Sequence, residues 1–158
     1  EIRPRDWSSD VCSSDLDTSS SGDFMSLFLM LVDTDTDTMR WVRAGHPPAI
    51  IYDRAADRFE ELRGEGMVLG FDESNSFREY EYTDWRETKV LFVGTDGIWE
   101  TENPDGEQFG MERLHTLIRE NREKPAQKAV DATLEAIRAF RGEKPQEDDV
   151  TMVMIKAG

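Results

Sequence analysis

The most constraining feature of the sequence is a change in the spacing of its apolar residues. From residue 24 to residue 93 these residues occur in short runs or alternate with polar ones, as in β-strands. From residue 111 to residue 140 they recur at helical spacing, and residues 150–155 (VTMVMI) return to a strand pattern. Strands followed by helices, without regular strand–helix alternation, predict an α+β fold with antiparallel sheet.

Seven segments have the length and composition of strands, and two have those of helices. The runs 24–32 (FMSLFLMLV) and 89–93 (KVLFV) are almost continuously apolar, which predicts strands buried on both faces. Segment 77–82 alternates, which predicts a half-exposed edge strand. The other expected strands are 39–43, 49–52, 59–62 and 150–155, with hairpins joining 24–32 to 39–43 and 49–52 to 59–62, and the expected helices are 111–120 and 126–140.

Composition narrows the classes of partner. The 158 residues suffice for one domain, and 19 Lys and Arg against 34 Asp and Glu give a net charge of −15. This charge repels nucleic acid and anionic membrane surfaces and favours a cation as partner. No apolar run approaches the ~18 residues of a membrane span. The single cysteine, Cys12, cannot form an internal disulfide, and no secretory signal precedes it, so we expect a cytoplasmic protein.

The first 16 residues follow neither the strand nor the helix period. Residues 6–16 (DWSSDVCSSDL) can be encoded by DNA that resembles a common sequencing-library adapter. We therefore interpret residues 1–16 as a cloning or assembly scar, with a natural disordered N-terminus as the alternative, and residues 17–158 as the domain.

Two acidic motifs stand where expected strands meet loops. Asp96 lies in GTDG, directly after segment 89–93, and its flanking glycines let the backbone turn and approach a ligand. Asp148 and Asp149 directly precede segment 150–155, and adjacent carboxylates repel each other unless a cation or hydrogen-bond donors neutralise them. Hard cations such as Mg²⁺ and Mn²⁺ favour such oxygen ligands. Taken singly, each motif is better explained without a metal, Asp96 as an ordinary turn aspartate and the acidic pair as a solvated loop.

Four motifs in fixed order make the pattern specific: AGHPP at 44–48, GTDGIWET at 94–101, FG at 109–110 and DDVT at 148–151. Together they resemble the C-terminal part of the SpoIIE-like branch of the PPM (PP2C-like) metal-dependent protein phosphatases, over about residues 19–156. The resemblance implies two antiparallel sheets flanked by helices, a PP2C-like α-β-β-α sandwich that here is incomplete at its N-terminus. It also implies hydrolysis of phosphoserine and phosphothreonine with two Mn²⁺ or Mg²⁺ ions. The implied substrate is a phosphorylated protein, such as an anti-sigma-factor antagonist in bacterial partner switching.

The same resemblance suggests the site residues. Asp96 matches the metal ligand of the family's TDG or SDG motif, with Gly97 as backbone near the metal. Asp148 matches the first ligand of the DD or DN motif, and Asp149 occupies its second place as a secondary candidate. The nucleophile would be metal-bound water, so no catalytic side chain is expected.

Two histidines belong to the expected elements without an assigned catalytic role. Gly45 and His46 are part of the AGHPP motif, and we favour a structural role for His46. His115 falls beside Leu114 on the first helix, where we expect it on the surface.

The remaining metal ligands of the family come from two earlier motifs, of GGD and D-x-x-G-H-G type, which the sequence lacks upstream of residue 24. Residues 21–24 (SGDF) imitate the first, but their distance from residues 44–46 fits a later core strand, which argues against Asp23 as a ligand. We therefore expect the first third of the domain to be missing. The chain alone should then bind Mn²⁺ weakly, lack appreciable activity and self-associate through the unpaired edges of strands 27–32 and 89–93.

One rival function is a metal-poor phosphatase-like module that binds a signalling partner without hydrolysis. The missing motifs, if found in the intact gene, would discriminate against it. A calcium loop at residues 33–44 fails, because an EF-hand needs glycine sixth and glutamate twelfth, where Thr38 and Ala44 stand.

Overall fold

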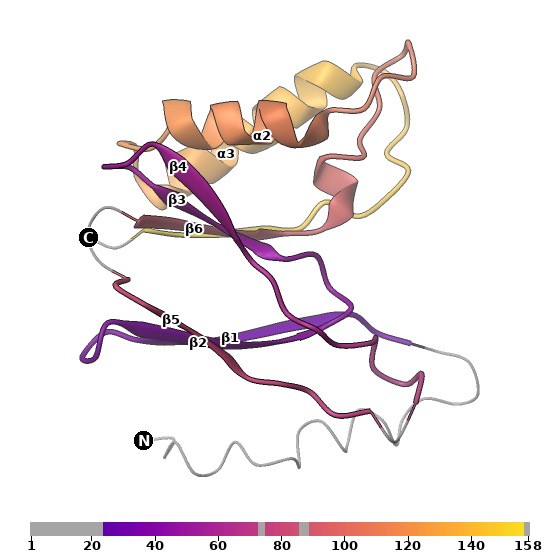
Figure 1. Cartoon of the computed structure of the whole chain (residues 1–158). Coiled ribbons are helices and arrows are strands. Elements are labelled where there is room, and N and C mark those ends of the chain that lie inside the picture. Colours follow the sequence, from indigo (N-terminus) through magenta and orange to yellow (C-terminus); the bar gives the residue numbers. More distant parts are fainter. Residues whose placement is uncertain (1–23, 73–74, 86–88, 157–158) are drawn as a thin grey trace.

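A computed structural model describes residues 24–72, 75–85 and 89–156. In this part of the chain two antiparallel sheets lie face to face, and two helices cover the outer face of one of them (Figure 1). The α+β fold with antiparallel sheets is therefore confirmed. The suspected scar at 1–16, Cys12 and Asp23 lie outside the described residues.

The larger sheet has four strands in the order β4-β3-β6-β7, and every neighbouring pair is antiparallel. Its strands are β3 (Ala49–Asp53), β4 (Arg58–Leu62), β6 (Lys89–Gly94) and β7 (Met152–Lys156). The 49–52/59–62 hairpin and the central place of segment 89–93 are confirmed. Because β6 is paired on both sides, the expectation that its edge lacks a partner is wrong.

The smaller sheet has three strands in the order β1-β2-β5, with antiparallel pairing throughout. Its strands are β1 (Leu27–Asp33), β2 (Thr38–Ala44) and β5 (Tyr80–Thr83). The first hairpin and the edge position of β5 are confirmed. In the β1–β2 turn, the Asp33 carboxylate accepts hydrogen bonds from the backbone N–H groups of Asp35 (2.9 Å) and Thr36 (3.1 Å), so the DTDTDT segment is a hairpin turn.

Strand β1 differs from its prediction. It lies at the edge of the three-stranded sheet, and Leu31 is 42% exposed. Phe28, Met30 and Val32 pack against the core between the sheets, whereas the alternate side chains face outward. An apolar run indicates that both faces favour burial, but no helix of the described residues covers the outer face of this sheet. The prediction that β1 is buried on both faces is therefore wrong for the described residues.

The helices are α2 (Gly110–Glu120) and α3 (Ala126–Arg141), close to their predicted ranges. Each has an apolar stripe, and the residues buried in α2 are Leu114 and Ile118. Pro125 stands immediately before α3 with extended backbone, and Gly142 ends that helix with a φ of +61°. No helix among the described residues has the length and apolar character needed to cross a membrane.

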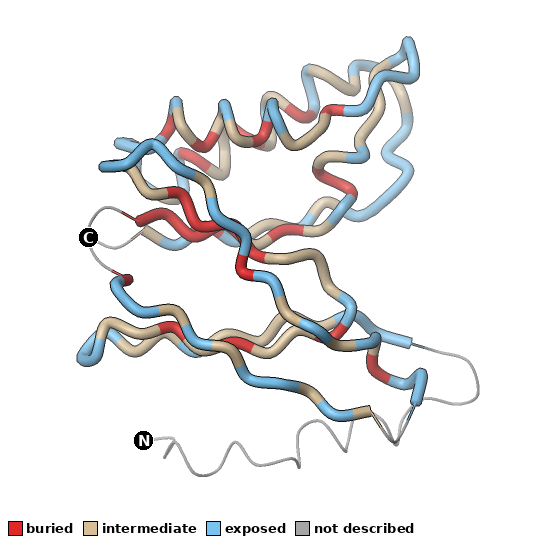
Figure 2. The backbone as a smooth tube through the Cα atoms, viewed as in Figure 1, coloured by how far each residue is buried: buried red, intermediate tan, exposed pale blue. Residues whose placement is uncertain are grey.

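The buried residues form two clusters (Figure 2). One lies between the four-stranded sheet and the helices, and the other lies between the two sheets. Strand β6 contributes to both, because Val90 and Phe92 face the helices while Leu91 faces the other sheet. This two-sided burial explains why its sequence is apolar without alternation.

His115 corrects one sequence-based prediction. Its ring stacks on Phe59 of β4, with centroids 4.0 Å apart and planes at 12°, so it is half-buried between helix and sheet rather than free on the surface. Burial lowers the pKa of His115, and the nearby charge of Arg119 lowers it further.

Candidate functional site

The two acidic motifs lie beside each other because the strands that carry them are neighbours. Strands β6 and β7 are antiparallel, and Gly94 pairs with Met152, so the end of β6 and the start of β7 meet at one edge of the sheet. The backbone N–H of Thr95 continues this pairing by donating to the carbonyl of Thr151 at 3.0 Å. Asp96 directly follows Thr95, and Asp149 stands two residues before Thr151.

The side chain of Thr95 joins the two loops. Its hydroxyl donates to the carbonyl of Asp149 at 2.8 Å and accepts from the N–H of Thr151 at 3.0 Å. These contacts hold the Asp148-Asp149 segment against the loop that follows β6. The sequence prediction missed Thr95, although its place before Asp96 in the GTDG motif was the available signal.

Gly97 allows the loops to approach closely. A Cβ atom at this position would lie 2.6 Å from the carbonyl oxygen of Asp149 and 3.4 Å from Cβ of Asp148. The first of these contacts is far inside normal packing distance and involves backbone, so a side chain at Gly97 would push the loops apart. The glycine is thus required by the approach of the two acidic motifs.

Asp96 is the first residue of a short 3-10 helix, η1 (Asp96–Ile98). The N–H of Glu100 donates to the Asp96 carbonyl at 2.9 Å, and the fully buried side chain of Ile98 anchors the turn in the core. The Asp96 side chain is exposed, and among the described residues its carboxylate has no hydrogen-bond or ion-pair partner. Within this part of the chain nothing neutralises the carboxylate, which leaves its oxygens available to a cation.

Asp148 and Asp149 are also exposed. One Asp148 carboxylate oxygen accepts from the N–H of Asp149 at 2.7 Å, which leaves the other oxygen open. Asp149 is held by its backbone carbonyl, through Thr95, and its carboxylate has no partner in the described segments. The structure therefore fixes the backbone of this pair more firmly than its side chains.

A salt-bridged lysine ties the acidic loop to Glu102, the residue that follows the GTDGIWET segment. The ammonium of Lys144 lies 2.5 Å from a carboxylate oxygen of Glu102 and 3.3 Å from one of Glu147. The hydrogen bond to Glu102 raises the pKa of Lys144. A cavity of about 170 Å³ lies beside these residues and Asp148. Lys144 was not a candidate from the sequence.

Gly45 and His46 form the turn between β2 and β3. Gly45 has a φ of +69°, and a Cβ there would lie 2.4 Å from Cγ1 of Val68, so the turn requires glycine. The Nδ1 atom of His46 is 2.9 Å from the carbonyl oxygen of Pro47, and the His46 carbonyl accepts a hydrogen bond from Nε of Arg43. These contacts support a structural role for both residues.

The fit of a metal ion to these residues is partial. Within the described ranges no group of three or more His, Cys, Asp or Glu side chains is placed to hold an ion. Asp96 and Asp148, on adjoining loops, offer carboxylate oxygens of the kind that Mg²⁺ and Mn²⁺ prefer, and these ions often use one or two carboxylates plus water. The donors suit a hard cation, but two carboxylates do not make a two-ion centre.

Comparisons with known proteins agree with this architecture. The family model of Stage II sporulation protein E (SpoIIE) matches residues 6–158. No curated protein matches the chain. Among solved structures, the SiaA-PP2C domain of Pseudomonas aeruginosa superposes with a TM-score of 0.80 at 20% identity, over 93% of this chain and 58% of that one.

Two further structures show the same fold. The Mn-presoaked phosphatase domain of SpoIIE from Bacillus subtilis has a TM-score of 0.63 at 18% identity, over 92% of this chain and 62% of that one. The RsbU and RsbW domains of Rv1364c from Mycobacterium tuberculosis have a TM-score of 0.68 at 19% identity, over 84% of this chain and 37% of that one. The chain thus spans less than two thirds of each of these structures.

Proposed function

The chain belongs to the SpoIIE family and has the PP2C phosphatase fold, and from this we propose that the intact domain hydrolyses phosphoserine and phosphothreonine on a protein substrate with Mn²⁺ or Mg²⁺. The observation that carries the proposal is the set of Thr95 hydrogen bonds, which joins the Asp96 loop to the Asp148 loop. Two carboxylate motifs separated by about 50 residues of sequence thereby share one edge of the sheet.

Divalent ions supply, when bound, a coordinated water of lowered pKa and positive charge for the phosphate oxygens. In the proposed site Asp96 and Asp148 hold the metal through their carboxylates, and Asp149 is the secondary candidate. Gly97 keeps the loops in contact, and Thr95 sets their spacing. We assign the remaining ligands to the GGD-type and D-x-x-G-H-G-type motifs of the intact gene, and on this assignment the 158-residue chain alone is inactive.

The proposed substrate is a phosphorylated protein of a bacterial signalling pathway, such as an anti-sigma-factor antagonist in partner switching. One structure with the same fold contains RsbU and RsbW domains, which supports this class of pathway. The net charge of −15 argues against nucleic acid as the partner and is compatible with a cytoplasmic enzyme.

The test compares the 158-residue chain with a version that continues upstream of residue 17 into the gene's own sequence. The extended domain should bind Mn²⁺ in calorimetry and release phosphate from a phosphoserine peptide, and the shorter chain should do neither appreciably. In the extended domain Asp96→Asn should lower turnover by more than about 100-fold, because the amide keeps the shape but not the charge. Asp105→Asn, at an exposed turn, is the matched control and should stay near wild type.

Activity of Asp96→Asn within about twofold of wild type would contradict the ligand assignment. The rival function, a binding module without hydrolysis, is favoured by one observation, the lack of a three-residue metal cluster in the described segments. It predicts that the extended domain binds a phosphopeptide equally well with and without Mn²⁺ and never releases phosphate.

A further inference from the structure

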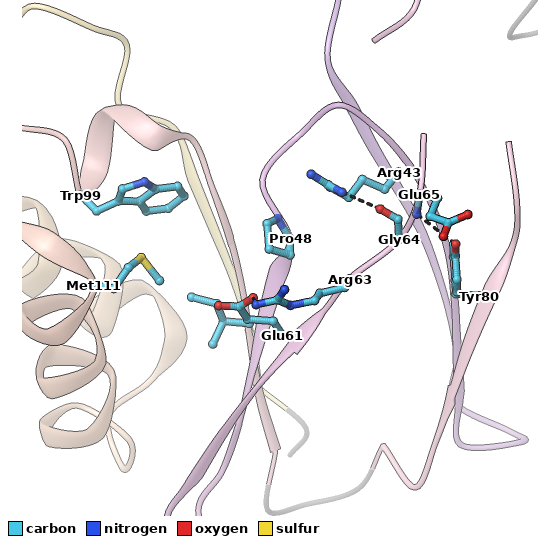
Figure 3. A pocket seen from close by; sticks show the side chains of 10 residues that line it. Arg43, Pro48, Glu61, Arg63, Gly64, Glu65, Tyr80, Trp99 and Met111 are labelled. Carbon is cyan, nitrogen blue, oxygen red and sulfur yellow. Dashed lines mark hydrogen bonds and ion pairs between the residues drawn. The ribbon is translucent and has the colours of Figure 1, made fainter. Parts of the chain in front are cut away.

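A groove of about 690 Å³ begins next to the Asp96 loop and runs toward the three-stranded sheet (Figure 3). Its volume is within the range of about 300–1,000 Å³ found for ligand clefts. Trp99, at one end, directly follows η1, so the groove starts within one helical turn of Asp96. We call this feature the Arg43–Trp99 groove after the residues at its two ends.

The end nearest the acidic loops is apolar. It is lined by Pro48 before β3, Ile50 in β3, Trp99 after η1 and Met111 in the first turn of α2. Trp99 and Met111 are only partly buried against the helix-side core, so part of each side chain faces the groove. Figure 3 shows these two side chains across from Pro48. An apolar side chain of a bound molecule would be desolvated here.

The other end presents a guanidinium without a carboxylate partner. Arg43 donates to the carbonyl of Gly64 at 2.5 Å and to that of His46, and no described carboxylate forms an ion pair with it. By contrast Arg63, also in the lining, is paired with Glu61 at 2.8 Å. Figure 3 shows the Arg43 guanidinium directed toward Pro48, into the groove.

Arg43 is notable because the chain carries a charge of −15, so most of its surface repels anions. The two carbonyls fix the guanidinium without cancelling its charge, and a half-buried, fixed guanidinium forms strong hydrogen bonds with a carboxylate. The groove therefore has the fixed guanidinium of Arg43 at one end, where Tyr80 and the exposed Glu65 also belong to the lining, and apolar walls at the other. This complementarity selects an occupant with an acidic group and an apolar group a few residues apart.

We propose that the Arg43–Trp99 groove binds the polypeptide segment next to the phosphoresidue of the substrate, with an acidic side chain on Arg43 and an apolar side chain against Trp99 and Met111. The identity of the occupant as a protein segment rests on the proposed phosphatase function. The groove would select substrates by the sequence around the phosphoresidue, while the acidic loops act on the phosphate.

The experiment uses the 158-residue chain and fluorescein-labelled, unphosphorylated peptides of Gly and Ser that carry one Glu and one Leu, separated by one to four residues. Binding is measured by fluorescence polarisation without added metal, so it does not depend on hydrolysis. The best peptide should bind about tenfold more tightly than its Glu→Gln version, the worth of a charge-assisted hydrogen bond. Its Leu→Ala version should also bind more weakly.

The variants locate the contacts. On Arg43→Gln the peptide's Glu→Gln change should cost nothing, and on Met111→Ala the peptide's Leu→Ala change should cost less than on wild type. Combining each protein change with the matching peptide change distinguishes the loss of one contact from a general loss of structure. Circular dichroism of each variant checks separately that it is folded. Arg58→Gln is the matched control, since Arg58 lies in β4 outside the lining and is 70% exposed.

The proposal is overturned if no peptide binds the folded chain at millimolar concentration, if Lys in place of Glu binds equally well, or if the Glu→Gln cost survives Arg43→Gln. Failure of the proposed function is a separate result. If the groove binds the peptides but the extended domain never releases phosphate, the groove proposal stands and the proposed phosphatase function is contradicted.

Discussion

The four-stranded sheet is covered on both faces along its central strands β3 and β6, whereas among the described residues the three-stranded sheet packs on one face only. Phe92 and Tyr52 of the larger sheet lie 1% exposed beneath the helices, and Ile51 and Leu91 lie 1% exposed on its other face. In the smaller sheet the inward side chains are covered, but Leu31 on the outer face is 42% exposed. The candidate site is built on the four-stranded sheet, at the end of its doubly covered strand β6.

The sheets are also offset. Strand β5 lies beside the end of β4, since the N–H of Glu65 donates to the hydroxyl of Tyr80 at 2.9 Å. At the opposite end of the larger sheet, Val153 and Ile155 of β7 are 52% and 38% exposed although they are paired with Val93 and Leu91. The described three-stranded sheet therefore stops short of β7. The burial of side chains therefore decreases from the helix-covered core toward the edge strands β1 and β7.

Removal of a large side chain from each region should reveal this difference most clearly. Phe92→Ala, in the doubly covered sheet, should lower the free energy of unfolding by about 3–5 kcal/mol. Phe28→Ala, in half-buried β1, should cost less than half as much, because less of its surface leaves water on folding. Urea denaturation of both variants measures this. Equal losses would show that the two regions are packed alike.

A second test concerns the hydrogen bonds that join β6 to β7. Thr95→Val should lower the free energy of unfolding by about 1–3 kcal/mol, because the hydroxyl bonds to Asp149 and Thr151 are lost at similar side-chain volume. Amide exchange should speed up at residues 148–151. Thr83→Val, at the exposed end of β5, is the matched control and should change stability by less than about 0.5 kcal/mol. Unchanged exchange in Thr95→Val would contradict the role of the Thr95 side chain.

The exposed apolar edges should make the chain self-associate. Leu31→Lys and Val153→Lys together should lower the mass measured by light scattering toward that of a monomer, since charge on an edge opposes pairing. Each change should alter stability by less than about 0.5 kcal/mol. Thr34→Lys, in the exposed β1–β2 turn, should leave the mass unchanged. A monomeric wild-type chain at micromolar concentration would refute this expectation.

The smallest expected effect is a pH dependence at the helix–sheet contact. Because burial lowers the pKa of His115 in the folded chain, the unfolded chain takes up a proton first as pH falls below about 6.5. The contribution of His115 to stability is therefore present above that pH and is lost as pH falls toward its folded pKa. For this partly exposed ring we expect a few tenths of a kcal/mol. His115→Gln should reduce the difference in urea midpoint between pH 7.5 and pH 5, and an unchanged difference would exclude the effect.

The sequence by itself determined the type and order of the elements. Apolar periodicity is a local property, and strands β2, β3, β4 and β6 and both helices lie close to their predicted ranges. It also predicted that Asp96 follows a central strand and that Asp148 precedes the last one. The pairing of β6 with β7 then placed both motifs at one edge of the sheet.

Only the tertiary structure decided what covers each face and which side chains join the loops. An apolar run indicates that both faces of β1 favour burial, but it does not show which element packs against each face. For this reason Leu31 was predicted to be buried, whereas it is exposed. Likewise, Thr95 meets Asp149 across 54 positions of sequence, and Arg43 meets Gly64 across 21. Such contacts depend on strand pairing and loop geometry, which local patterns do not encode.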